Sequence, residues 1–237
     1  MYQTYVRYLA IVPALFLLGA CNSDSNNNIP APPTPVPTPT QTYQVSISNL
    51  SYSQPLSPVA IIIHDSSYSG WTLGGAASDG LEQLAEGGDN SEFLASSEVE
   101  SVVGGEGIIM PGVTETLEVT LDEMPEVRLT VATMLVNTND AFIGMTGSDL
   151  TGLGVGESQM FELPVYDAGT EANMELTGTI PGPADGGVGY DATRDDIDYV
   201  ARHPGVVSSA GGYSESVLDE SHRFDAPVAL LTVTRVD

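Results

Sequence analysis

The chain alternates short apolar runs with polar breaks, and the runs have the period of β-strands. Tyr43, Val45 and Ile47 are apolar, while the residues between them are polar. A period of two places one face of a strand against a core and the other in water. Residues 59–63 are apolar without a break, which is typical of a central strand covered on both faces. These patterns predict strands as the main secondary structure.

Four further segments are predicted as strands, and turn residues separate them. They are residues 114–121, 127–136, 160–166 and 228–236. A short polar stretch joins the first two, which predicts a hairpin with its turn at residues 122–126. Residues 178–225 contain repeated Gly and Pro breakers and no period, so we expect an irregular region there.

One helix is predicted between the strands. Asp79 and Glu82 have the spacing of a capping box, apolar residues then recur at helical spacing, and Gly87-Gly88 ends the segment. A second helical turn is expected over residues 91–95. Many short strands with one short helix in a connection favour the all-β class, and the turn spacing favours an antiparallel β-sandwich.

Residues 1–21 have the pattern of a bacterial lipoprotein signal peptide. Arg7 precedes an apolar stretch that is too short for a membrane span. The four residues that end at Cys21 (Leu-Gly-Ala-Cys) match a lipobox, which predicts that Cys21 becomes a lipidated amino terminus. The alternative is an ordinary signal peptide followed by a buried cysteine. Cys21 is the only cysteine, so an intrachain disulfide is excluded.

Residues 22–41 are expected to form a linker. They are rich in Asn, Pro and Thr, a composition that buries little apolar surface and favours extended polyproline II. The folded domain is therefore expected at residues 42–237. Asn22 follows the lipidated position, and by analogy with Gram-negative sorting it favours the outer membrane. We expect a lipid-anchored protein of the bacterial cell envelope, periplasmic or exposed at the surface.

The charge of the chain is strongly negative. It has 32 acidic residues against six basic ones, all arginine, and a formal net charge of −26. Such a polyanion repels nucleic acid phosphates and anionic lipid headgroups. Nucleic acid is therefore excluded as a partner, and the membrane is reached only through the lipid on Cys21. Cations are the natural partners. A solvated acidic surface explains most of the acids but need not explain the few at strand ends.

Two aspartates stand where an apolar, strand-like run breaks into a loop. Asp140 is at one such break and Asp167 at another, and amides, hydroxyls and carboxylates crowd just past each. Oxygen ligands that converge at loop ends are what a calcium ion requires. Asn139 and Glu171 are further candidate oxygen donors. The alternative is that both aspartates only form Asx turns with their own backbone.

The sequence around both aspartates resembles the spondin N-terminal domain family, the module at the front of F-spondin and mindin. Asp140 precedes Ala-Phe-Ile-Gly, and Asp167 lies in Tyr-Asp-Ala-Gly-Thr. Residues 42–50 and 226–236 look like the opening and closing strands of bacterial members, so the likeness covers residues 42–237. The cysteines of the animal domains are absent, so no disulfide framework is carried over.

The resemblance implies a β-sandwich with a topology akin to that of calcium-dependent phospholipid-binding domains. It also implies one calcium ion held by two aspartates and one glutamate. The aspartates correspond to Asp140 and Asp167, and the glutamate corresponds to Glu118, which lies in a Leu-Glu-Val context on the preceding strand. Placing Glu118 there requires a slightly longer turn in this chain than in the family.

Two functions compete at this point. The resemblance implies a module without catalytic residues for adhesion or matrix-type binding, whose partner is an extracellular protein or glycan. The alternative is a secreted hydrolase of polysaccharide or ester substrates that uses His64, Asp65 or His203. Clustering of these histidines with a serine or carboxylate would favour the enzyme. Scattered histidines and converging aspartates would favour the binding module.

Overall fold

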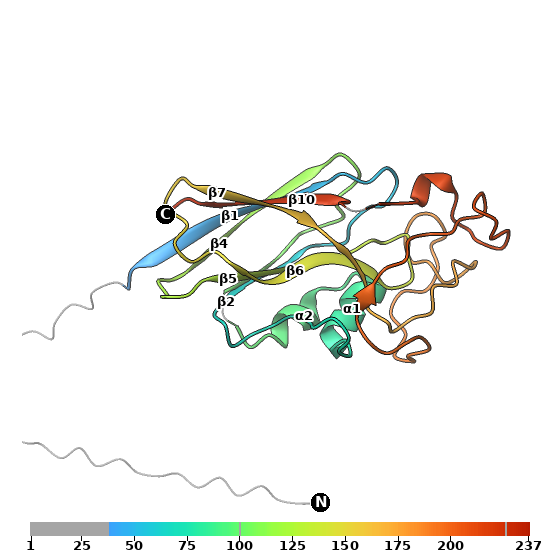
Figure 1. The fold of residues 1–237 in the computed structure, drawn as a ribbon, viewed down its shortest axis with the longest axis horizontal. Helices are drawn as coiled ribbons and strands as arrows, with labels where there is room; N and C mark the ends of the chain where they lie inside the picture. Colours follow the sequence, from blue (N-terminus) through green and yellow to red (C-terminus); the bar gives the residue numbers. More distant parts are fainter. Residues whose placement is uncertain (1–37, 100, 226) are drawn as a thin grey trace, which may run out of the picture. The chain divides into compact units, whose positions relative to one another are not determined.

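A computed structural model describes residues 38–99, 101–225 and 227–237 as two antiparallel β-sheets packed against each other (Figure 1). This arrangement confirms the predicted all-β antiparallel sandwich. The expected signal peptide, Cys21 and nearly all of the expected linker lie outside the described residues. The first strand begins at Thr40, just before the predicted start of the domain.

The first sheet holds four strands in the order β4-β1-β10-β7. β1 pairs with β10 on one side and with β4 on the other, so Tyr43 lies opposite both Arg235 and Val119. The strands predicted at both ends of the domain therefore lie side by side. The bounds of the four strands are β1 (Thr40–Asn49), β4 (Thr114–Asp122), β7 (Ser158–Leu163) and β10 (Ala229–Arg235).

The second sheet holds six strands in the order β3-β2-β5-β6-β8-β9. The continuous apolar run at residues 59–63 forms β2, which is buried along its whole length as predicted. The bounds of the six strands are β2 (Ala60–His64), β3 (Val102–Gly104), β5 (Arg128–Met134), β6 (Ala141–Asp149), β8 (Val165–Asp167) and β9 (Ala201–Arg202).

The hairpin predicted across residues 122–126 is wrong. β4 pairs with β1 in the first sheet, whereas β5 pairs with β2 and β6 in the second. The residues between β4 and β5 therefore carry the chain from one sheet to the other. A short polar turn between two strand patterns is compatible with a hairpin and with a sandwich corner, and only the strand partners distinguish the two.

β6 forms where the sequence patterns predict no separate strand. Its glycines lower the intrinsic preference for a strand, yet Gly144 is required at its position. A Cβ there would lie 2.0 Å from the carbonyl oxygen of Val131 on β5. Glycine therefore allows the close approach of the two strands at this point.

The main core lies between the two sheets. Tyr43, Val45 and Ile47 on β1 are buried in it, as their alternation predicts. The polar residues between them face outward and form hydroxyl pairs with the neighbouring strand, such as Ser46 with Thr116 at 2.8 Å. The period of two along β1 therefore separates a dry face from a wet face.

A second apolar cluster covers the outer face of the six-stranded sheet. Two helices, α1 (Asp79–Gly87) and α2 (Ser91–Ala95), lie over this face (Figure 1). Phe93 of α2 is buried in the same cluster as Trp71 and Phe142. The rings of Trp71 and Phe142 meet edge to face with their centroids 5.1 Å apart. The helix cover explains why the inner strands of this sheet are buried on both faces.

The start of α1 is one residue earlier than the predicted cap. Ser78 is the N-cap, and its Oγ accepts the N–H of Leu81 at 3.2 Å, whereas Asp79 is already helical. Gly88 ends the helix in a left-handed conformation with φ of 70°, as the Gly87-Gly88 pair predicts.

Residues 168–225, which we call the loop end, extend from one end of the sandwich (Figure 1). Within this segment only β9 and the short 3-10 helix η1 (Glu220–His222) are regular, as the Gly and Pro breakers predict. The N–H of Thr42 donates to the carbonyl oxygen of Asp237 at 3.2 Å. The beginning of β1 and the carboxyl terminus therefore lie together at the opposite end, which we call the root.

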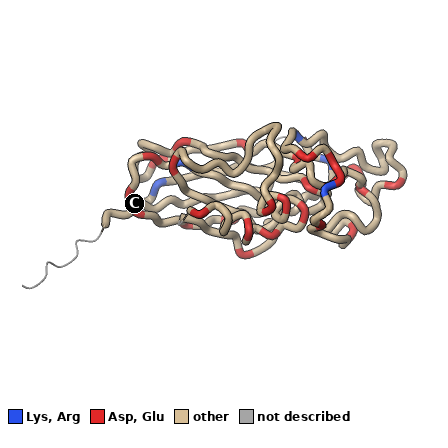
Figure 2. Tube along the Cα trace, turned by 90° about the horizontal axis from the view of Figure 1, so that it is seen from below, with Lys and Arg blue, Asp and Glu red and all other residues tan. Residues whose placement is uncertain are grey.

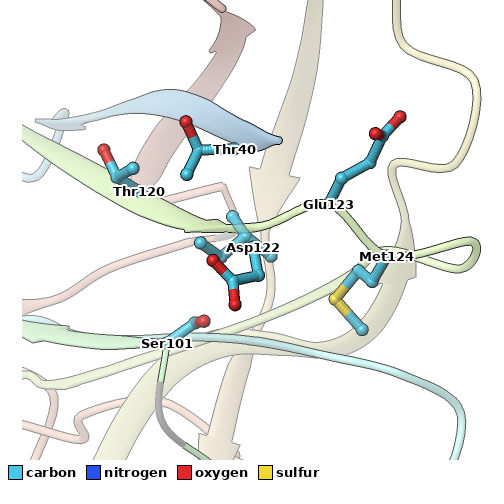
Figure 3. A pocket seen from close by; sticks show the side chains of 7 residues that line it. Thr40, Ser101, Thr120, Asp122, Glu123 and Met124 are labelled. Carbon is cyan, nitrogen blue, oxygen red and sulfur yellow. The ribbon is translucent and has the colours of Figure 1, made fainter. Parts of the chain in front are cut away.

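Acidic residues occur along the whole domain and gather toward the loop end (Figure 2). Across residues 38–99, 101–225 and 227–237, no helix has the length and apolar character needed to cross a membrane. A hollow of about 490 Å³ lies near the root and is lined mainly by β4 residues and Thr40 (Figure 3). This hollow is remote in the fold from the two predicted aspartates, which lie toward the loop end.

Candidate metal-binding site

Two neighbouring strands bring Asp140 and Asp167 together. Asp140 is the residue before β6, and Asp167 is the last residue of β8. The two strands are antiparallel, with Ala141 opposite Asp167. The rings of Phe142 and Tyr166, the next pair along the ladder, stack with their centroids 5.2 Å apart. This aromatic contact fixes the two strand ends against the second core.

Asp140 is fully buried, and only one of its two carboxylate oxygens has hydrogen-bond partners. Its Oδ2 accepts the N–H of Thr170 at 2.9 Å and that of Glu171 at 3.3 Å. Its Oδ1 is buried without a hydrogen-bond partner. Burial, followed by the charges of Asp167 and Asp196, raises the pKa of Asp140 to about 8. A carboxylate oxygen left in this state is costly unless a proton or a cation reaches it.

Asp167 is buried but has a partner at each oxygen. Its Oδ1 accepts the N–H of Gly169 at 2.8 Å, and its Oδ2 accepts the side-chain amide of Asn173 at 2.7 Å. Burial raises the pKa of Asp167 as well. Gly169 has φ of 73°, and a Cβ there would lie 2.3 Å from the carbonyl oxygen of Tyr199. Glycine is therefore required at this position of the Tyr-Asp-Ala-Gly-Thr motif, because the backbone is left-handed there and no room remains for a Cβ atom.

The Asx-turn alternative applies to one aspartate and not to the other. Asp167 does bond the N–H two residues ahead of it, which is the contact of an Asx turn. Asp140 instead bonds Thr170 and Glu171, thirty residues further along the chain. The carboxylate of Asp140 therefore organises a distant loop, and turn formation does not explain why an aspartate is needed at this position.

The donor set fits a hard divalent cation. Asp140 and Asp167 are buried carboxylates whose negative charges repel each other. No salt bridge in the described part of the chain neutralises either of them. Oxygen donors of this kind suit calcium, which also takes backbone carbonyls and water. Among the described residues, however, no three His, Cys, Asp or Glu side chains already form a metal-holding group. The structure thus offers two of the three predicted side chains.

Glu118, the third predicted ligand, is not brought to this pair. It lies on β4 in the four-stranded sheet, opposite Gln44. Its side chain is exposed, and it alternates with Leu117 and Val119, which contact the core. A strand residue between two inward-facing neighbours points to solvent. Glu118 therefore belongs to the outer face of the other sheet.

Asn139 and Glu171, the two additional candidate donors, differ in whether they keep an oxygen available for a metal ion. Asn139 directs its Oδ1 to the N–H of Glu175 at 3.3 Å and its amide Nδ2 to Oε1 of Glu171 at 2.9 Å. Its oxygen is therefore already used. Glu171 keeps its Oε2 buried and without a partner. Burial, followed by the charge of Glu86, raises the pKa of Glu171 to about 7.

The three histidines lie at separate places and do not form a catalytic set. His64 contacts the backbone carbonyl of Asp65 and the hydroxyl of Thr130. His203 contacts Asn173, and His222 contacts Asp219. In the described part of the chain, none of the three ring systems bonds a serine hydroxyl. His64 and His203, the two histidines considered for a hydrolase, bond neither a serine hydroxyl nor a carboxylate among the described residues, and the carboxylate that His222 contacts caps η1.

His203 has a structural connection that sequence reasoning missed. The N–H of Gly205 donates to its Nδ1 at 2.9 Å, so the proton lies on Nε2, which donates to Oδ1 of Asn173 at 2.9 Å. Asn173 in turn donates to Asp167. Burial lowers the pKa of His203 to about 4. His203 was singled out in the sequence only for a possible enzyme, and nothing in its local pattern indicates the link to Asp167.

Comparison with known proteins gives one result for this chain. A family model described as Spondin_N matches residues 45–180. The match includes the second half of β1, both predicted aspartates and the Tyr-Asp-Ala-Gly-Thr motif, and it ends within the loop end. No curated protein matches the chain.

Proposed function

Because this chain belongs to the spondin N-terminal domain family, we propose that it is a calcium-binding adhesion or matrix-type module of the bacterial cell envelope. Membership of the family carries the coarser statement directly: the domain is an extracellular-type binding module, and the family is one of binding domains without enzymatic activity. The calcium ion, the envelope location and the adhesive role are the proposed part.

One observation carries the calcium proposal. Oδ1 of Asp140 is buried without a partner beside a second buried carboxylate, and the pKa of Asp140 is raised to about 8. A calcium ion held by Asp140 and Asp167 would give that oxygen a partner and offset the repulsion between the two charges. Because Asp140 also binds the backbone of Thr170 and Glu171, the ion would stabilise the beginning of the loop end.

Calcium removal should lower the stability of the purified protein. Binding to the folded state alone stabilises it by about 2.7 kcal/mol when free calcium is about 100-fold above its dissociation constant. We expect melting temperatures to rise between chelator and millimolar calcium in the wild type. Asp140→Asn and Asp167→Asn should remove most of this gain, whereas Asp122→Asn, an exposed change on β4, should keep it.

The Glu118→Gln variant tests whether Glu118 is a ligand of the proposed calcium ion. Because Glu118 is exposed on the other sheet, we expect the Glu118→Gln variant to respond to calcium as the wild type does. A loss of the response in Glu118→Gln would restore Glu118 as the third ligand. Equal melting temperatures in calcium and chelator for the wild type, with no calcium heat by calorimetry, would remove the calcium proposal altogether.

The envelope location rests on the sequence of the amino terminus, which lies outside the described residues. We propose that Cys21 is lipidated and that the chain from residue 22 to the start of β1 at Thr40 tethers the domain. Mass spectrometry of membrane fractions should find a mature chain that begins at a lipid-bearing Cys21, and Cys21→Ser should prevent this processing. An unmodified mature chain that retains residues 1–20 would contradict the anchor.

The adhesive role calls for a partner of the protein or glycan class. A pull-down from cell-surface material, performed with and without calcium, is the direct test. We expect a bound extracellular protein or glycan in calcium, and weaker capture by Asp140→Asn. Capture that is equal for the wild type and for Asp140→Asn would separate the partner from the metal, and no capture in either condition would count against adhesion.

A further inference from the structure

A second group of carboxylates lies beside the Asp140 pair and has the same deficit of partners. We propose that Glu86 and Glu171, with Asp191 and Asp195 at the surface, form a second site for a calcium ion. This site uses none of the residues that the family likeness assigns to calcium. The inference does not require the Asp140 site to be filled.

Glu86 provides the first observation. It lies in the last turn of α1, and its side chain is fully buried. Its Oε2 accepts the N–H of Asp191 at 3.0 Å, while its Oε1 is buried without a partner. The carbonyl end of a helix carries partial negative charge, so a carboxylate there is disfavoured by the helix as well as by burial. A bound cation would offset both costs.

Glu171 provides the second observation, from the other side of the same space. Its Oε1 accepts the amide of Asn139, and its Oε2 is buried without a partner. After burial, the charges that raise the pKa of Glu171 belong to Glu86, Asp195 and Asp191. Asp191 donates its backbone N–H to Glu86, and Glu171, Asp191 and Asp195 line one cavity, so the four side chains lie near one another. For Asp140, the corresponding charges are those of Asp167 and Asp196.

A cavity gives an ion access to three of the four carboxylates of this second group. It has a volume of about 340 Å³, and its walls include Glu171, Asp191 and Asp195 together with the hydroxyl-bearing Thr179 and Thr193. Asp191 and Asp195 are exposed, and each uses its Oδ1 to accept a backbone N–H, from Thr193 and from Ala172 at 2.9 Å, so the Oδ2 of each is the atom offered to an ion. Glu86 and Glu171 are each fixed at one oxygen, by Asp191 and Asn139 respectively. Hydroxyl, carboxylate and water oxygens are the ligands that a calcium ion accepts in sets of six to eight.

No side-chain cation in the described part of the chain compensates this group. Arg194 is close in sequence, but its guanidinium bonds Glu82 at 2.6 Å, Asp198 at 2.8 Å and the carbonyl oxygen of Ala77 at 2.9 Å. None of the salt bridges found among these residues includes Glu86 or Glu171. Arginine is thus directed away from the second group and toward α1.

The ligands of this second site are not already assembled, so binding of the ion would have to bring the carboxylates together. No three acidic side chains of the described chain already converge at coordination distance. The two buried carboxylates fix the place, and the exposed aspartates supply charge as they close over it. The lining contains no histidine or cysteine, so the donor set selects a hard cation such as calcium over zinc or copper.

The two sites share a segment of backbone. The N–H groups of Thr170 and Glu171 donate to Asp140, while the Glu171 side chain belongs to the second group. An ion at either site therefore orders the residues that the other site uses. We expect positive cooperativity between two calcium ions for this reason.

Equilibrium dialysis with radioactive calcium counts the ions for each chain. It is performed on the purified protein at pH 8, where Glu171 is ionised. We expect two ions in the wild type, one in Glu171→Gln and one in Asp167→Asn. Glu106→Gln, an exposed change of the same kind on another loop, should keep two. Circular dichroism of each variant checks that the fold is retained.

A milder variant keeps the test independent of buried substitutions. Asp195→Asn alters an exposed side chain and should weaken one of the two ions about tenfold. A wild type that binds one ion, lost in Asp167→Asn and kept in Glu171→Gln, would overturn the second site and leave the Asp140 site standing. One ion with the reverse pattern would support the second site and overturn the first. No bound ion would overturn both.

Discussion

The body of the sandwich and the loop end are held by different interactions. In the body, apolar side chains from two sheets share one core, and the backbone groups pair between strands. The loop end has one small apolar cluster of its own, which consists of Ile180, Val206 and Leu218. Its backbone is held by local bonds between backbone groups, such as the N–H of Gly187 to the carbonyl oxygen of Ile180 at 2.8 Å, and in addition by buried carboxylates that accept N–H groups. A long irregular segment is thus ordered without a sheet when polar side chains take the place of strand partners.

Glu175 is the centre of this arrangement. Its Oε1 accepts the N–H of Val207 at 2.7 Å, and its Oε2 accepts the N–H of Ser208 at 3.0 Å and the hydroxyl of Ser216 at 2.5 Å. Glu175 and Ser208 both have positive φ, at 52° and 66°. The carboxylate therefore holds Glu175 and Ser208 in a left-handed backbone conformation that residues other than glycine rarely adopt.

Arg194 connects the loop end to the body. Its guanidinium makes two hydrogen bonds to Oε2 of Glu82 on α1, at 2.9 Å and 2.6 Å, and one to Asp198. Glu82 is almost completely buried, so this ion pair is shielded from solvent. The contact ties the middle of the loop end to the helix that covers the six-stranded sheet.

The largest effect is expected from a cavity in the body. Phe142→Ala removes a buried ring that contacts Trp71 and Tyr166, and such a change costs about 3–5 kcal/mol of unfolding free energy. Urea unfolding measures it, with Ser46→Ala as a control. Ser46 is on the outer face, so its change should stay within about 0.5 kcal/mol. Similar losses in both variants would contradict the contrast between a sheet face buried under the helices and a sheet face open to solvent.

A smaller and local effect is expected at the loop end. Glu175→Gln replaces an acceptor by an amide at one oxygen position and leaves buried donors without a partner, at a cost of about 1–3 kcal/mol. Hydrogen exchange should become faster at residues 204–218 and stay unchanged in β1. Glu162→Gln on β7, whose side chain is exposed, serves as the matched control. Faster exchange throughout the body would show that the two regions are not separate.

The most gradual effect is a dependence on pH. Burial lowers the pKa of His203 to about 4 in the folded protein, below its ordinary value of 6.5. Between these values the unfolded chain binds the extra proton, so stability from this group is present above pH 6.5 and is lost as the pH falls toward 4. The slope is at most roughly 1.4 kcal/mol per pH unit.

The variant His203→Gln isolates this contribution. We expect its stability to change less than that of the wild type between pH 6.5 and 4, as measured by urea unfolding at each pH. Limited proteolysis in the wild type should cut the loop end first as the pH falls. Parallel pH profiles for the two proteins would show that His203 does not titrate with folding.

The body was largely predictable because its signals are local. The alternation at Tyr43, Val45 and Ile47 and the unbroken run at residues 59–63 report directly on which faces are buried. The hairpin error at residues 122–126 has the same origin, because a local pattern does not say which strand lies alongside. β6 was missed because Gly144 is kept for close approach to β5 and not for strand preference.

The site was predictable only where a motif marks it. Asp140 and Asp167 stand at pattern breaks that resemble a family, and the structure places them at adjacent strand ends. Glu118 shows the limit of that approach, because its register on β4 turns it outward. The link from Asp167 through Asn173 to His203 joins residues 36 positions apart across an irregular loop, and no period or spacing in the sequence reports such a contact.

The placement of the root opposite the loop end has a mechanical consequence. The ten residues of β1, at about 3.3 Å each, run roughly 33 Å from the root toward the other end. If the chain is anchored before Thr40 and grips a partner at the loop end, the pulling force acts along the strands. β1 would then have to slide past β4 and β10, and the hydrogen bonds of both ladders would carry the load together. We expect an attachment built in this way to resist tension by shear instead of opening one bond at a time.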